Sequence, residues 1–234
     1  AYVETYVENL SNSFSTVNLL DRRACLESLL SSRSELQGDV IVINDCSPEP
    51  AIAEFLRRLE RESRITLLEN DENLGFVKSC NRAAALRPEN DFVLLNADTE
   101  VYGNWLDRMV AHAATASDIA SITPFSNNAT IASYPRGGAR RETPADIWVA
   151  QIDEAMSIAN AGESVPLPTA VGFCMWVSRA AWQEAGGFDE RFGRGYGEEV
   201  EFCMATAANG WRHLLACDVF VYHAGGTSFG YESE

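Results

Sequence analysis

Short apolar runs alternate with helical patterns along the first half of the chain. Four runs, each rich in β-branched or aliphatic residues, occupy Val40–Ile43, Ile65–Leu68, Phe92–Leu95 and Ile119–Thr123. Apolar residues spaced as on one face of a helix follow the first three runs, over Ile52–Leu59, Val77–Ala85 and Trp105–Ala113. Continuous apolar strands that alternate with helices are typical of a parallel sheet covered by helices on both faces. The pattern therefore predicts an α/β fold.

The remainder of the chain has a less regular pattern. Tyr2–Tyr6 is a short, polar segment that we expect to form an edge-like strand. Ser126–Asn128 is predicted to be a loop, and Ile147–Ala161 an amphipathic helix that packs over the site. A final apolar run, Val219–Tyr222, ends at His223.

The charge balance limits the partners of the protein. The 234 residues include 18 basic and 34 acidic side chains, which gives a formal net charge of −16. Nucleic-acid binding requires a basic surface, so we expect no nucleic-acid partner. Anionic membrane surfaces attract basic segments, so the acidity of the chain disfavours direct binding to them. No apolar run approaches the roughly 18 residues of a membrane span, so we predict no integral membrane segment. The first ten residues carry acids and no base, which is unlike a secretory signal.

The six cysteines are widely spaced and include no C-x-x-C pair. This spacing gives no support to a zinc ribbon or a redox motif. We interpret the cysteines as small buried residues in a reducing compartment, and disulfides are the alternative.

Polar side chains follow three consecutive strands of the predicted sheet. The segments are Asn44–Ser47, Glu69–Gly75 and Asn96–Glu100, and each contributes a carboxylate. Right-handed crossovers place the carboxyl ends of parallel strands at one edge, where open α/β sheets bind ligands. Asn and Asp also cap helices and form turns, which accounts for any one of these loops. Three such loops at one edge favour a polar ligand site.

The same loops exclude two common nucleotide sites. The chain has no G-x-G-x-x-G motif between a strand and a helix, and no G-x-x-x-x-G-K-[ST] phosphate loop. Asp45, Asp98, Glu100 and His223 remain as candidates for an acidic site. Mg²⁺ takes carboxylate and phosphate oxygens, whereas a His ligand is more typical of Mn²⁺. One Asp and one His do not complete such a shell, so we expect a diphosphate of the ligand to supply further oxygens.

A series of motifs from about residue 16 to the C-terminus carries a family resemblance. They are Asn44–Ser47, Asn73–Phe76 with Asn81, Leu94–Glu100, Gly172–Met175, Gly186–Phe192, Tyr196–Glu201 and His223. In this order they resemble family 2 glycosyltransferases, a class of inverting, nucleotide-sugar-dependent enzymes with the GT-A fold. Within that family, the pattern is similar to bacterial hexosyl- or deoxyhexosyltransferases that build surface polysaccharide.

The resemblance implies a domain organisation. We expect a Rossmann-like, mostly parallel sheet with helices on both faces and a smaller mixed acceptor-side region. Residues 1–234 would form a single domain, with a nucleotide-binding half over about 1–123. The acceptor-binding and catalytic half would cover about 124–234.

The resemblance also assigns the donor and metal sites. The donor-binding residues would be Tyr6, Asp45, Asn73, Gly75, Lys78, Asn81, Asn96 and Asp98. Asp98 and His223 would be the metal ligands, with Mg²⁺ or Mn²⁺ as the cofactor. Asn96 stands where the family often has Asp, and an amide oxygen is a weaker ligand. The alternatives are that Asp45 caps the helix near Ala51, that Lys78 only solvates a helix face, and that His223 is a hydrogen-bonded structural residue.

On the acceptor side, the resemblance makes Glu199 the catalytic base. An ionised carboxylate can remove a proton from an acceptor hydroxyl once it is positioned. Here a Glu stands where the family has Asp. The alternative is that the acids of this segment only stabilise a helix N-terminus through the helix dipole. Trp176, Asp189 and Glu198 are the other predicted acceptor-side residues, and core packing is the alternative for Trp176 and Trp182.

We therefore predict metal-assisted, inverting transfer of a sugar from a nucleotide-diphosphate donor to a hydroxyl of a glycan or glycolipid. The expected location is the cytoplasm, either free or peripheral to the inner membrane face. One alternative is a catalytically degenerate GT-A domain that serves as a sugar-nucleotide binding or scaffold module. A sugar-nucleotide pyrophosphorylase is less consistent, because the chain lacks the Gly-rich, basic N-terminal segment of those enzymes.

Overall fold

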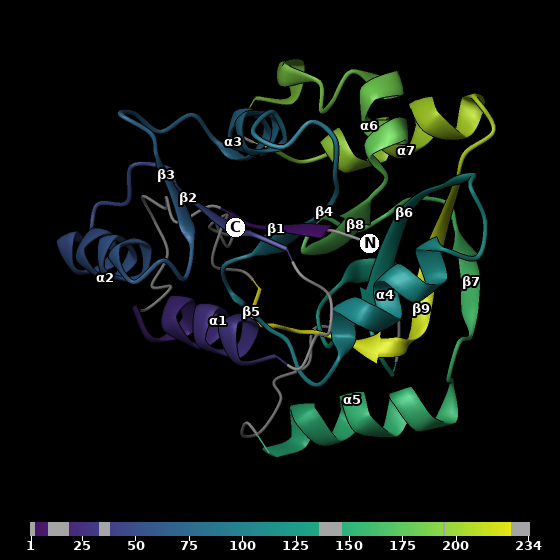
Figure 1. Ribbon diagram of the computed structural model, residues 1–234. Helices are drawn as coiled ribbons and strands as arrows, with labels where there is room; N and C mark the ends of the chain where they lie inside the picture. The colour runs from purple at the N-terminus through teal and green to yellow at the C-terminus, as the bar shows by residue number, and fades with distance from the viewer. Residues whose placement is uncertain (1–2, 9–18, 33–37, 136–146, 194, 226–234) are drawn as a thin grey trace, which may run out of the picture.

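The computed structural model describes residues 3–8, 19–32, 38–135, 147–193 and 195–225 (Figure 1). A mixed sheet with the strand order β3-β2-β1-β4-β8-β6-β9-β7 runs through the centre. Its strands are β1 (Val3–Glu8), β2 (Val40–Asn44), β3 (Thr66–Glu69), β4 (Asp91–Asn96), β6 (Ile119–Phe125), β7 (Ser164–Leu167), β8 (Cys174–Val177) and β9 (Arg212–Phe220). Two short strands, β5 (Thr99–Glu100) and β10 (Tyr222–His223), form a separate antiparallel ribbon.

Strand direction brings the ends of distant segments to one edge of the sheet. β1 pairs in parallel with β2 and β4, and β2 with β3. β8 is antiparallel to both β4 and β6, so β6 runs in the same direction as β4. β9 is parallel to β6. The carboxyl ends of β2, β3, β4, β6 and β9 therefore lie at the same edge as that of β1.

The first strand corrects the sequence-based expectation. The Tyr2–Tyr6 segment was expected to be edge-like, but β1 lies in the middle of the sheet between β2 and β4. The backbone of Tyr6 is opposite both Ile41 and Leu94. The polar composition of the segment suggested an exposed strand, whereas the connections of the neighbouring strands decide its place in the sheet.

Helices cover both faces of the sheet (Figure 1). They are α1 (Leu19–Ser31), α2 (Pro50–Arg61), α3 (Phe76–Ala84), α4 (Trp105–Ala113), α5 (Ile147–Ala159), α6 (Arg179–Ala185) and α7 (Glu198–Ala208), with short 3₁₀ turns at Thr130–Ala132 and Glu190–Phe192. One apolar cluster lies under α1, α2 and α4, and a second lies under α3, α6 and α7. Burial of these two faces is the main favourable term for the fold.

Special residues fix the helix ends near the site. Pro50 begins α2, where its missing N–H is not needed. Gly75 precedes α3 with φ 80° and Gly197 precedes α7 with φ 99°, a region that favours glycine. A Cβ on Gly197 would also lie 3.0 Å from Phe192 Cε1. These two glycines allow the chain to enter α3 and α7 directly from tight turns.

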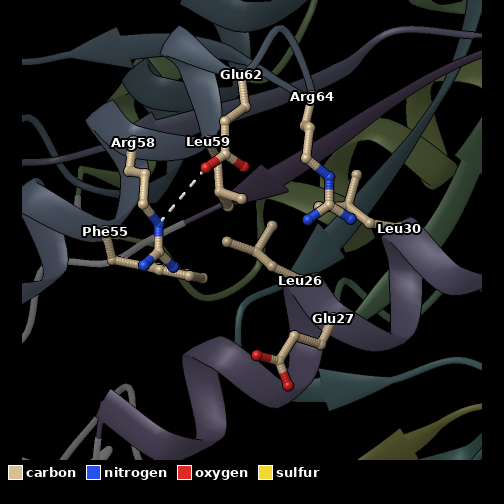
Figure 2. A pocket seen from close by; sticks show the side chains of 8 residues that line it. All are labelled: Leu26, Glu27, Leu30, Phe55, Arg58, Leu59, Glu62 and Arg64. Atoms are coloured by element: carbon tan, nitrogen blue, oxygen red, sulfur yellow. Dashed lines mark ion pairs between the residues drawn. The ribbon is translucent and has the colours of Figure 1, made fainter.

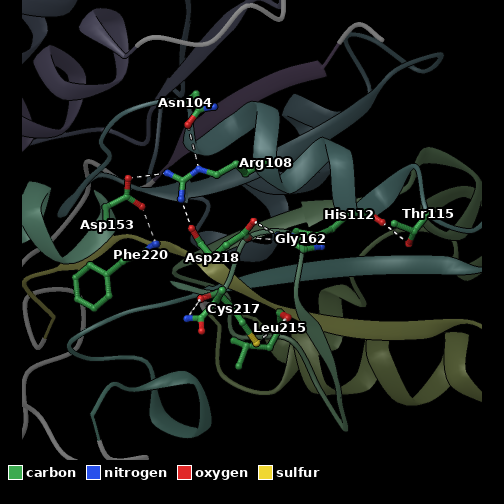
Figure 3. Close-up of polar contacts among 11 residues, drawn as sticks. Asn104, Arg108, His112, Thr115, Asp153, Gly162, Leu215, Cys217, Asp218 and Phe220 are labelled. Atoms are coloured by element: carbon green, nitrogen blue, oxygen red, sulfur yellow. Dashed lines mark hydrogen bonds and ion pairs between the residues drawn. The ribbon is translucent and has the colours of Figure 1, made fainter. Parts of the chain in front are cut away.

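A buried polar network fastens α4 and α5 to β9 (Figure 3). Arg108 Nη2 lies 2.6 Å from Asp153 Oδ2, and Arg108 Nη1 donates to the carbonyl of Asp218. His112 Nε2 is 2.7 Å from Asp218 Oδ1, while Phe220 N donates to Asp153 Oδ1 at 3.0 Å. Burial raises the pKa of Asp153, although Arg108 opposes the shift. Burial acts in the same direction on Asp218, but hydrogen bonds from His112 and a backbone N–H leave its pKa lowered.

A small cavity lies between α1 and α2 (Figure 2). Its volume is about 110 Å³, and it is lined by Leu26, Glu27, Leu30, Phe55, Arg58, Leu59, Glu62 and Arg64. No predicted site residue lines this cavity, so it is separate from the candidate active site. Among the described residues, no helix has the length and apolar character needed to cross a membrane.

Candidate active site

The sheet topology gathers the predicted polar residues at one edge. Asp45 follows β2, Asp98 follows β4, and His223 ends the β9–β10 segment. The β5–β10 ribbon places His223 opposite Thr99, and Ala224 N donates to the carbonyl of Asp98 at 3.0 Å. Chain connectivity and backbone pairing therefore bring Asp98 and His223 together, as the sequence predicted.

The side chains of Asp98 and His223 meet directly. His223 Nε2 lies 3.3 Å from Asp98 Oδ1, and Gly225 N donates to Asp98 Oδ2 at 3.2 Å. Asp98 is 6% exposed. A Cβ on Gly225 would be 1.6 Å from Asn128 Nδ2, so only glycine fits at this position. The backbone thus binds one oxygen of the carboxylate, and the imidazole lies next to the other.

Two asparagines that sequence reasoning left in a loop hold His223 in place. Asn127 Nδ2 donates to the carbonyl of His223 at 2.9 Å, and His223 N donates to Asn127 Oδ1 at 2.8 Å. His223 Nδ1 lies 2.7 Å from the carbonyl oxygen of Asn128. The ring also stacks on Phe173, with 5.1 Å between centroids. The signal that would have found Asn127 is its place directly after β6, at the same edge as Asp98.

This arrangement fits a divalent cation. The Asn128 carbonyl assigns the imidazole hydrogen to Nδ1, which leaves the Nε2 lone pair directed at Asp98. A metal-ligating His commonly donates its other N–H to a backbone carbonyl. Ligands in adjacent octahedral positions, each about 2.1 Å from the metal, are about 3 Å apart, which is close to the separation seen here. Among the described residues, no group of three or more acidic, His or Cys side chains forms a complete metal site.

Asp45 is fully buried and binds the loop before α3. Its Oδ1 accepts hydrogen bonds of 2.7 Å from both Asn70 Nδ2 and Leu74 N, and its Oδ2 accepts one of 2.9 Å from Gly75 N. Asp45 does not cap α2, because the N-cap residue of that helix is Glu49. Asp45 therefore shapes the Asn70–Gly75 loop, and its contact with a donor nucleotide stays a prediction.

Of the other residues predicted to bind the sugar-nucleotide donor, some are hydrogen-bonded within the protein and others are exposed to solvent. Asn81 binds the backbone of Phe188 through two hydrogen bonds. Its Nδ2 donates to the Phe188 carbonyl at 2.8 Å, and its Oδ1 accepts from the Phe188 N–H at 3.0 Å. Asn73 and Lys78 are exposed. Asn96 is half-buried, and its N–H donates to the carbonyl of Phe173 at 2.9 Å. Gly75 has a φ of 80° and precedes α3.

Glu198 and Glu199 begin α7, as the sequence predicted for a helix start. Glu198 is 4% exposed and Glu199 is half-buried. Within the described residues, Oε2 of each is buried and has no hydrogen-bond partner. Burial, and then the negative charge of Glu199, raise the pKa of Glu198 to about 7. Two unsatisfied buried carboxyl oxygens are costly for stability, and such groups are typical of functional sites.

The segment Ala170–Phe173 links Glu199 to the Asp98–His223 pair. Ala170 N donates to Cys203 Sγ at 3.2 Å, which anchors the segment to α7. A Cβ built on Gly172 would lie 4.0 Å from Glu199 Cδ. The next residue, Phe173, stacks on His223 and accepts the hydrogen bond from Asn96. Glu199 therefore lies beside the same segment that contacts the Asp98–His223 pair.

The structure places the predicted acceptor-side residues differently. Trp176 is 3% exposed in β8 and Trp182 is 6% exposed in α6, so both pack in the core, which was the alternative for them. Asp189 caps the Glu190–Phe192 turn and accepts hydrogen bonds from Arg191, which lower its pKa, and its contact with an acceptor stays a prediction. His112 and His213 are buried and hydrogen-bonded.

Comparisons with known proteins agree with this architecture. The structure of GalNAc-T7 with UDP, GalNAc and Mn²⁺ superposes with a TM-score of 0.70 at 17% identity, covering 95% of this chain and 43% of that one. The mannosyltransferase PcManGT from Pyrobaculum calidifontis, in complex with GDP-Man and Mn²⁺, gives 0.60 at 16% identity, with coverages of 95% and 56%. S. aureus TarS 1–349 gives 0.59 at 14% identity, with coverages of 95% and 59%. The chain thus spans about half the length of these structures. Comparison with curated protein sequences finds no match.

The fold is that of the GT-A glycosyltransferases. The family model named glycosyl transferase family 2 matches residues 23–185, and the chain belongs to that family.

Proposed function

We propose that this chain is an inverting glycosyltransferase that moves a sugar from a nucleotide-diphosphate donor to an acceptor hydroxyl. One observation carries the proposal: Glu199, a carboxylate with a buried oxygen free of hydrogen bonds, lies beside Gly172, and the adjacent Phe173 stacks on His223 beside Asp98. A base and a cation-compatible pair then border the same short segment. The UDP, GDP-Man and Mn²⁺ in the related structures support this class of donor and metal.

The base acts on the acceptor hydroxyl. Glu199 removes the proton as the acceptor oxygen attacks the anomeric carbon, and the bond to the nucleoside diphosphate breaks in the same displacement. The anomeric configuration inverts, and no covalent glycosyl-enzyme forms. General-base catalysis of this kind typically contributes 10²–10⁴-fold.

Asp98 and His223 would hold the divalent cation, Mg²⁺ or Mn²⁺. The cation supplies charge stabilisation for the leaving diphosphate. The residues of the chain set its place: Asn127 and Asn128 fix the imidazole, and Gly225 N–H fixes the carboxylate. Two protein ligands leave coordination positions for diphosphate oxygens. Because the net charge is −16, a diphosphate ligand needs a counter-cation or aimed backbone dipoles to offset the acidity of the chain.

In this proposal the two halves of the domain supply different parts of the site. Residues 1–123 carry the donor-side strand ends and Asp98, and residues 124–234 carry Asn127, Glu199 and His223. The acceptor is a glycan or glycolipid hydroxyl that approaches from the α7 side. A cytoplasmic location, free or at the inner face of the membrane, is consistent with six free cysteines.

The test is a panel of UDP-, GDP- and dTDP-sugars, scored first by thermal shift with Mn²⁺ and then by transfer. A bound donor should raise the melting temperature in a metal-dependent way. NMR of the product should show the anomeric configuration opposite to that of the donor. A product with retained configuration would contradict the single displacement, and the absence of metal-dependent donor binding would favour the scaffold alternative.

A further inference from the structure

Glu198 differs from the other acids of its helix turn. It is 4% exposed, whereas Glu199 and Glu201 are half-buried. Its Oε2 has no hydrogen-bond partner among the described residues, and neither has Oε2 of the adjoining Glu199. The residue before it, Gly197, gives the helix no side-chain cap. Two carboxyl groups of consecutive residues therefore enter the protein interior with an unsatisfied oxygen each.

Among the described residues, no ion pair joins Glu198 or Glu199 to a basic side chain. Around α7 the described basic side chains have partners elsewhere: Arg191 binds Asp189, Arg212 binds Asp118, and Arg179 binds the carbonyls of Asn90 and Ala84. The other titratable groups described on or beside the helix include Tyr196, Cys203, His213, Glu201 and Glu184, and Glu184 accepts from Trp211. Burial lowers the pKa of His213, so that ring stays neutral near pH 7. Two neighbouring carboxylates that both lose solvent do not both ionise without such compensation.

We propose that Glu198 is a positioning residue whose neutral, buried carboxyl group keeps Glu199 as the single charged base of the site. The assignment of the proton follows the burial, because desolvation penalises the charged form most where exposure is least. Glu198 is the more buried of the two, and Glu199 is the one beside Gly172, whose neighbour Phe173 stacks on His223. The pKa of about 7 for Glu198 agrees with this division.

The neutral group acts through its neighbour rather than on substrate. When Glu198 carries a proton, Glu199 meets no like charge from the adjoining residue. When Glu198 ionises, two negative charges repel at the start of α7 and the base loses its position. The effect of Glu198 is therefore read from the stability and the turnover of the whole protein. This inference rests on the proposed role of Glu199, but its stability consequence does not.

Glu198→Gln is the direct test, because an amide resembles a protonated carboxyl in size and charge. The folded-state pKa of wild-type Glu198 lies above its ordinary value, so the stability that the bound proton provides is lost as pH rises towards 7. The variant has no proton to lose. Relative to wild type, its melting temperature should gain about 5 °C between pH 5 and pH 8. Glu201→Gln, which removes a half-buried acid of the same turn, should show no such gain.

Turnover separates positioning from catalysis. Glu198→Gln should keep kcat within about threefold of wild type at pH 6.5 and lose the decline in rate above pH 7, whereas Glu199→Gln loses at least about 100-fold. A loss in Glu198→Gln equal to that in Glu199→Gln would overturn the proposal, because Glu198 would then act as an ionised base. A pH-independent stability difference would overturn the assignment of the proton.

The proposal remains testable if the variant fails to fold. A ¹³C NMR titration of glutamate-labelled wild-type protein should show one carboxyl group with a midpoint near pH 7, and its absence would overturn the inference. If the proposed function itself is wrong, the same measurements would give a different combination of results. No variant would then transfer sugar, while the stability gain of Glu198→Gln and the NMR midpoint would persist.

Discussion

His223 Nε2 lies 3.3 Å from Asp98 Oδ1, and this contact joins the end of β4 to the end of the last strand. The imidazole is oriented for it by the Asn128 carbonyl on Nδ1 and by stacking on Phe173. The two side chains come from opposite halves of the chain, so the pair exists only in the folded domain.

Removal of either member of the pair should weaken metal binding. Asp98→Asn takes away the charge, and His223→Ala takes away the nitrogen ligand, so each should raise the Kd for Mn²⁺ by at least about tenfold. Calorimetry with Mn²⁺ and a nucleoside diphosphate measures this directly. Cys46→Ser, an exposed change after β2, serves as the control. Unchanged Mn²⁺ affinity in both variants would remove the pair from the metal site.

Asn127 should act on the metal only through His223. Asn127→Ala removes both hydrogen bonds to the His223 backbone, and supporting residues of this kind typically contribute 10–100-fold to metal affinity. Asn127→Asp keeps the acceptor but loses the donor, so its Mn²⁺ affinity should fall between those of Asn127→Ala and wild type. Full Mn²⁺ affinity in Asn127→Ala would show that these two hydrogen bonds have no effect on His223 as a metal ligand.

The buried Arg108–Asp153 ion pair should contribute far more to the free energy of unfolding than an exposed ion pair does. Asp153→Ala leaves the buried guanidinium without its carboxylate and the Phe220 N–H without its acceptor. We expect a loss of about 3 kcal/mol in the free energy of unfolding, measured by urea denaturation. The matched control is Asp118→Ala, which breaks the exposed pair with Arg212 and should lower the free energy of unfolding far less than Asp153→Ala. Equal losses would contradict the structural role of the network.

Asp45 should affect both the loop and the donor. Asp45→Ala removes the acceptor for Asn70 Nδ2 and for two backbone N–H groups, so we expect a loss of about 2 kcal/mol in stability. If Asp45 also contacts the donor, the affinity of the protein for the donor should fall further in Asp45→Ala than in Asn70→Ala. Asn70→Ala breaks only one of the hydrogen bonds that Asp45 accepts. Equal donor affinities in the two variants would limit Asp45 to shaping the loop.

The strands and helices between Val40 and Phe125 were predictable because each apolar run has a clear length and period. β2, β3, β4 and β6 and the helices α2 to α4 match the expected segments to within one or two residues. The position of β1 was not predictable, because its residues are polar and its place depends on pairing with β2 and β4. The antiparallel insertion of β8 between β4 and β6 likewise leaves no local signal.

The candidate site likewise contains residues that a local motif marks and residues whose place only the folded structure shows. Asp98, His223 and Glu199 could be proposed from the sequence because they follow strands or begin a helix within recognisable motifs, and their roles stay predictions. Asn127 carries no motif, and its importance appears only when β6 and β10 are seen to end side by side. Trp176 was misplaced because an aromatic residue in a strand has the same sequence pattern whether it faces a ligand or the core.

The central claim is that Glu199 and the Asp98–His223 pair serve one reaction centre. The most direct measurement compares Glu199→Gln with Glu201→Gln for sugar transfer and for donor Kd, in the presence of Mn²⁺. We predict that Glu199→Gln lowers kcat by at least about 100-fold with a donor Kd within about twofold of wild type, while Glu201→Gln changes neither. Full turnover in Glu199→Gln would contradict the account.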